Sequence, residues 1–134
     1  LSGENGLLAL EQLNPASCGL VKGKVDSGAV LEAVEDKELA NEALDWERFL
    51  LTGFMSQKVA KMVTEFYFQA LKKRYEHISR VIDQTLKANA AGLLFIREGH
   101  PVQFPKDVEV FFVAPPALDE IRRWQQSRQS RQKE

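Results

Sequence analysis

One long amphipathic helix limits the folds that this sequence can adopt. Apolar side chains recur mostly at three- and four-residue spacing from Gln57 to Ala88, directly after Ser56, a residue type that favours helix N-termini. At about 1.5 Å per residue such a helix is roughly 45 Å long, which exceeds the width of a small domain. The pattern therefore predicts either a break near residues 72–74 or packing of part of the helix on another subunit.

Two apolar segments that follow this helix are expected to form β-strands. Residues 92–96 (GLLFI) and 108–113 (VEVFFV) are nearly continuous apolar runs, as is typical of strands covered on both faces. A final helix is expected to begin at Pro116, because proline suits the first helical turn. If both segments and the long helix form the core, Phe66→Ala or Phe95→Ala should cost roughly 3–5 kcal/mol.

The predicted fold is therefore α/β, with α+β as the alternative. Long amphipathic helices would pack on a small sheet, whose strands are parallel or antiparallel, and a C-terminal helix would complete the fold. Two strands alone form only a marginal sheet. A third strand is expected from the N-terminal part of the chain, from residues outside this sequence or from a partner chain.

The 134 residues correspond to about one domain. We expect a single helix-rich α/β domain over residues 1–126, in which residues 1–28 form a loosely ordered arm. Residues 127–134 are expected to be a polar, basic tail.

Local signals divide the first half of the chain further. The leucines before Pro15 predict a short helix, and the weak alternation over residues 19–25 predicts a short strand or an extended arm. Ser27 and Asp36 are expected to cap two helices. Gly53 is expected to end the second of them.

The turn between the two predicted strands contains the candidate site residues. Glu98 and His100 could act as an acid/base pair or as ligands of a divalent ion, and Arg97 and Gly99 are candidate ligand-binding residues. In open α/β sheets, ligands bind beyond the carboxyl ends of the strands, where this turn would lie. We favour the alternative of a polar loop tip, because no HxxxH or CxxC spacing completes a metal site. No metal ion is predicted, and the residues specify no cofactor.

Charge and composition narrow the classes of partner. The net charge of −1 argues against nucleic acid as a partner. Apolar runs fall far short of the ~20 residues that cross a bilayer, so no membrane segment is expected. Cys18 is the only cysteine, which fits a reducing, cytoplasmic location and a small buried thiol. The basic residues near the C-terminus are expected to be solvated; they are Arg122, Arg123, Arg128, Arg131 and Lys133.

The function expected from these features is a non-enzymatic binding or regulatory domain of an oligomer or larger protein. The over-long helix and the incomplete sheet favour a protein partner or self-association. The alternative is a small hydrolase or metal-dependent enzyme that uses the Glu98/His100 turn. A nucleic-acid-associated domain that uses the basic tail is a third, weaker hypothesis.

Overall fold

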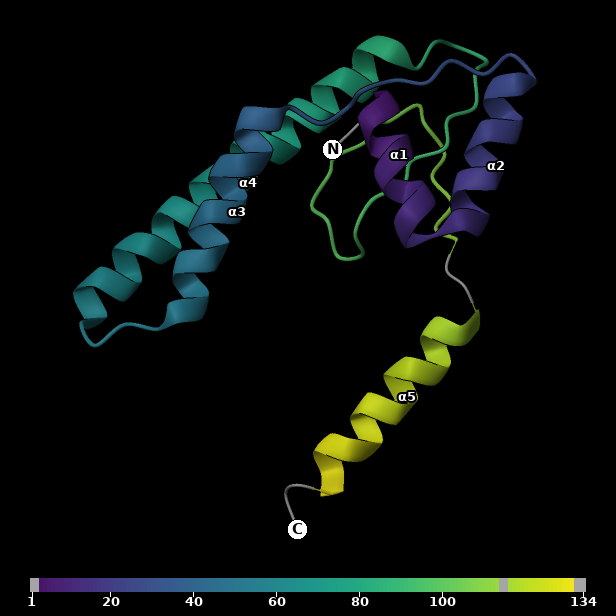
Figure 1. The fold of residues 1–134 in the computed structure, drawn as a ribbon. Helices are drawn as coiled ribbons and strands as arrows, with labels where there is room; N and C mark the ends of the chain where they lie inside the picture. Colours follow the sequence, from purple (N-terminus) through teal and green to yellow (C-terminus); the bar gives the residue numbers. More distant parts are fainter. Residues whose placement is uncertain (1–2, 114–115, 132–134) are drawn as a thin grey trace.

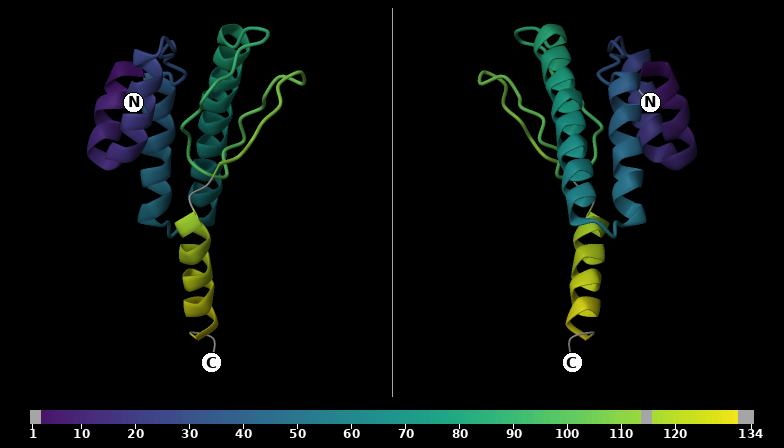
Figure 2. Two further views of the ribbon diagram at one scale, coloured as in Figure 1. Left: turned by 90° about the vertical axis from the view of Figure 1, so that its right-hand side faces the viewer. Right: turned by 90° about the vertical axis from the view of Figure 1, so that its left-hand side faces the viewer.

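The computed structural model describes residues 3–113 and 116–131, which form helices and the segments that join them (Figure 1). Helices α1 and α2 pack against each other, as do α3 and α4, whereas α5 packs against no other described helix. Figure 2 shows α5 projecting away from the other helices. The helices are α1 (Gly3–Leu13), α2 (Pro15–Asp26), α3 (Lys37–Thr52), α4 (Gln57–Thr85) and α5 (Pro116–Arg131).

Side-chain caps and one glycine set the bounds of the central helices. The Asp36 carboxylate accepts a hydrogen bond from the backbone N–H of Leu39 at 2.9 Å, and the Ser56 hydroxyl accepts one from Val59 at 3.4 Å. Gly53 ends α3 with φ 72°, a left-handed conformation that costs glycine little. The caps predicted at Asp36 and Ser56 and the stop predicted at Gly53 are confirmed.

The N-terminal part of the chain is more helical than expected. Helix α1 ends before Pro15 as predicted, but the strand predicted over residues 19–25 is wrong, because α2 occupies this segment. The Asn14 side chain caps α2, and Pro15 lies in its first turn. The helix predicted after Ser27 is also wrong. Ser27 instead closes α2, with its N–H donating to carbonyls of the last helical turn.

The core is small and lies around the C-terminal half of α4. Tyr75, Ile78 and Ile82 of this helix are buried together with Val102 from the segment that follows it. Partly buried side chains from the α2–α3 connection, from α4 and from the following segment surround this cluster; they are Val34, Leu71, Leu94, Ile96 and Phe104. The large buried side chains of this cluster therefore come mainly from the C-terminal half of α4.

The predicted α/β fold is wrong, and so is its α+β alternative, because the described residues contain no strand. Residues 92–96 place Leu94 and Ile96 on the core, while Leu93 and Phe95 are 63% and 47% exposed. One face of the segment is thus covered by α4, whereas the prediction assumed that both faces were buried. A strand needs a neighbouring strand to pair its backbone groups. No backbone hydrogen bond joins this segment to residues 108–113 within the described part of the chain.

Helix α4 is continuous, so a break near residues 72–74 is excluded. Its 29 residues correspond to about 44 Å. It ends at Thr85, three residues before the predicted Ala88, where the N–H of Leu86 donates to the carbonyl of Ile82 at 2.9 Å. Its N-terminal half packs against α3, and its C-terminal half carries the core.

The C-terminal helix begins at Pro116 as predicted but extends further than expected. Helix α5 continues to Arg131, so the first residues of the predicted tail are helical. Residues 132–134 of that tail lie outside the described residues.

Candidate interaction surface

The structure directs Glu98 and His100 to different neighbours. Glu98 forms an ion pair with Arg122 of α5. His100 packs its ring near Phe104 and Phe112, with ring centroids 6.1 and 6.2 Å apart, and its Nδ1 accepts a hydrogen bond from the N–H of Val102 at 3.3 Å. Both side chains thus have contacts that stabilise the loop and tether α5. Neither the ion pair of Glu98 nor the contacts of His100 favour acid/base or metal chemistry at the turn.

Arg97 and Gly99 complete the predicted turn. Gly99 has φ 74°, the left-handed conformation expected for a glycine at a loop tip. The Arg97 side chain forms an ion pair with Glu47 of α3, outside the turn, with Nη1 and Oε1 3.6 Å apart. The pKa of Arg97 is raised by the electrostatic influence of Tyr75, followed by a hydrogen bond to Tyr67 and the charge of Glu47.

Arg97 also lines a hollow of about 220 Å³ between α3, α4 and the following segment. The other arginine in this hollow, Arg74, makes two hydrogen bonds to Glu35, at 2.8 and 2.5 Å. These bonds raise the pKa of the Arg74 guanidinium, although burial opposes them. Both arginines are already paired with carboxylates, so the hollow has little excess positive charge to offer an anion.

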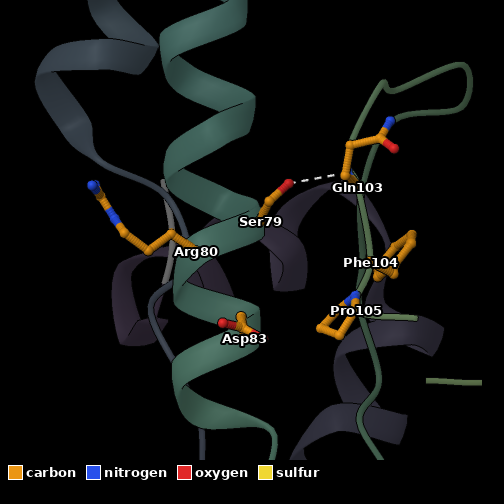
Figure 3. Close-up of a pocket in the computed structure, with 6 residues that line it drawn as sticks. All are labelled: Ser79, Arg80, Asp83, Gln103, Phe104 and Pro105. Atoms are coloured by element: carbon orange, nitrogen blue, oxygen red, sulfur yellow. Dashed lines mark hydrogen bonds between the residues drawn. The ribbon is translucent and has the colours of Figure 1, made fainter. Parts of the chain in front are cut away.

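A second, more open hollow of about 270 Å³ lies beside the C-terminal half of α4. Figure 3 shows Ser79 pointing toward Gln103, whose backbone N–H donates to the Ser79 hydroxyl at 3.0 Å. Arg80 points to the other side of the helix, away from Phe104. The polar groups here do not converge on one point, so this hollow is a poor candidate for a small-molecule site.

In the part of the chain that the structure describes, no group of three or more His, Cys, Asp or Glu side chains is arranged to hold a metal ion. None of the described helices is long and apolar enough to cross a membrane.

Three basic residues of α5 contact other groups of the protein; they are Arg122, Arg123 and Arg128. Arg122 pairs with Asp119 as well as with Glu98, and Arg123 donates to the carbonyl of Asp119 at 3.2 Å. Arg128 lies over the ring of Trp124, 4.5 Å from its centroid. These contacts reduce the number of cations that are available to a phosphate backbone.

The clearest surface feature is an apolar face on the α3–α4 hairpin. It consists of Trp46 and Phe49 of α3 and Val59, Met62 and Phe66 of α4, and is called the Trp46 face below. The centroid of the Trp46 ring lies 5.1 Å from that of Phe66 on α4 and 5.9 Å from that of Phe49 on α3. These ring contacts join the two helices into one surface. Phe49 is 54% exposed, and the three residues of α4 are 43–46% exposed.

Helix periodicity explains why these side chains share a face. On α4 they follow the three- and four-residue spacing that brings positions 59, 62 and 66 to one side. The opposite side of the helix is occupied elsewhere, since Tyr75, Ile78 and Ile82 are buried in the core. The apolar pattern predicted either a break in the helix or packing of part of it on another subunit, but it did not identify which side chains are exposed. The signal that was missed is that α4 carries more apolar residues than one buried face needs.

No protein-family model, curated protein or solved structure matches the chain.

Proposed function

We propose that this chain is a non-enzymatic protein-binding module that works as part of an oligomer or larger assembly. The observation that supports the proposal most is its accessible surface of 11204 Å². A compact monomer of 15.2 kDa is expected to expose about 7,100 Å². The surplus of about 4,000 Å² is well above the roughly 800 Å² per partner that a standard protein–protein interface buries.

The exposed side chains are of the kind that a partner would cover. Large apolar residues are exposed on α3, on α4, on residues 108–113 and on α5. Phe111, Phe112 and Val113 are each more than 75% exposed, and so is Leu51 at the end of α3. Exposed apolar side chains that gather into one patch mark interaction sites, and those of the Trp46 face gather in this way.

Binding of the dye ANS by the folded chain tests this proposal. The native chain, diluted until light scattering gives a monomeric mass, should enhance ANS fluorescence while its far-UV circular dichroism stays helical. The probe responds to exposed apolar surface. A folded monomer that leaves ANS fluorescence unchanged would show that these side chains are covered within the chain, and would overturn the proposal.

A further inference from the structure

We infer that the Trp46 face binds a second copy of this chain, so that two α3–α4 hairpins form a four-helix bundle around a two-fold axis. This inference rests on the proposed function and names the partner. Two antiparallel helix pairs with one apolar face each are the parts from which such bundles are built.

The charges of the two helices are complementary, which favours a second copy over an unrelated partner. Helix α3 carries four acidic and two basic residues, and α4 carries six basic and three acidic residues. A two-fold axis parallel to the hairpin places α3 of each copy opposite α4 of the other. The same patch then serves both copies, with an acidic helix facing a basic one on each side of the axis.

One pair of residues next to the Trp46 face shows this complementarity. Lys73 lies seven residues after Phe66, so it continues the stripe of positions 59, 62 and 66 along α4. Glu42 lies one turn before Trp46 on α3. Both side chains are exposed, and neither forms an ion pair with another described residue.

The levels of these two residues along the hairpin also agree. Trp46 and Phe66 stack at one level. Measured along the helices from that level, and away from the loop that joins α3 to α4, Glu42 lies about 6 Å and Lys73 about 10 Å away. The two distances differ by less than one helical turn. Since a parallel two-fold axis preserves these levels, Glu42 of each copy faces Lys73 of the other.

Charge exchange between two variants tests this arrangement. Glu42→Lys and Lys73→Glu should each raise the dimer dissociation constant at least about tenfold, because each homodimer then contains two like-charge pairs. In an equimolar mixture of the two variants, every such pair in the mixed dimer is of opposite charge. The mixture should therefore recover the parental dissociation constant, as measured by sedimentation equilibrium, and native mass spectrometry should show the mixed dimer.

A matched pair of substitutions on α4 tests the apolar part of the face. Met62→Glu adds a carboxylate within the Trp46 face and should leave only monomer at concentrations where the parent is dimeric. Phe68→Glu adds the same group outside the face, at a side chain that is 62% exposed, and should leave the dimer intact. Circular dichroism of both variants confirms that each is folded.

The outcomes separate this inference from the proposed function. Single charge variants that associate like the parent, or a mixture that fails to recover, would overturn the pairing of α3 with α4. A parent chain that stays monomeric but binds ANS would overturn self-pairing and leave a different protein as the partner. A monomer that does not bind ANS would overturn both.

Discussion

The substitution Ile78→Ala should reveal how much of the stability depends on the small core beside α4. Ile78 is 2% exposed and packs with Tyr75, Ile82 and Val102. The substitution removes three carbon groups, which at about 0.8 kcal/mol each correspond to about 2.4 kcal/mol of lost burial. A residual cavity adds to this cost, although a core that is open at its sides can partly collapse. We therefore expect the free energy of unfolding to fall by about 3 kcal/mol.

Urea denaturation followed by far-UV circular dichroism measures this change, at one protein concentration for all variants because association would add to the apparent stability. Leu51→Ala is the control, because Leu51 is 83% exposed and makes no contact with the core cluster. Its expected effect is within about 0.5 kcal/mol. Equal losses for the two variants, or a loss below about 1 kcal/mol for Ile78→Ala, would refute the assignment of the core.

Three further predictions concern single positions. Glu35→Gln should lower the free energy of unfolding by about 1–3 kcal/mol, because it removes the carboxylate that pairs with the partly buried Arg74. An unchanged urea midpoint would show that the ion pair contributes nothing to stability. Gly53→Ala should cost on the order of 1 kcal/mol, since alanine is strained at φ 72°, and a stabilised variant would contradict that backbone conformation. Cys18, which is 2% exposed, should react with a thiol reagent far more slowly in buffer than in urea; equal rates would place the thiol at the surface.

The helices whose ends carry local signals could be predicted from the sequence. Asp36, Ser56 and Gly53 fix the ends of α3 and the start of α4 through hydrogen bonds and a backbone conformation that involve only neighbouring residues. Pro116 marks the start of α5 in the same way. Capping chemistry of this kind is encoded within a few residues, so it can be read without knowledge of the tertiary structure.

The sheet was wrongly predicted because the decisive contacts are not local. Residues 92–96 have the composition of a buried strand, but whether a strand forms depends on a neighbour that supplies backbone hydrogen bonds. In the structure this segment lies on α4, and half of its apolar side chains are exposed. Phe66 and Phe95, taken as core residues from the sequence, are 43% and 47% exposed. Their replacement by alanine in the monomer should therefore cost less than a fully buried phenylalanine would.

The candidate site was predictable only in its position. The sequence indicated a turn at residues 97–100, and a turn is present there with Gly99 in a left-handed conformation. The partners of this turn come from α3 and α5, which are distant in the sequence, and no local pattern identifies them. The Trp46 face was equally hidden, because apolar spacing on a helix does not distinguish a face buried within the chain from one that awaits a partner.

The mass of the chain in solution, measured by light scattering over a range of concentrations, tests self-association most directly. The account predicts that the mass rises with concentration from 15.2 kDa to twice that value. A mass of 15.2 kDa at every concentration up to the limit of solubility would contradict the pairing of two hairpins through the Trp46 face.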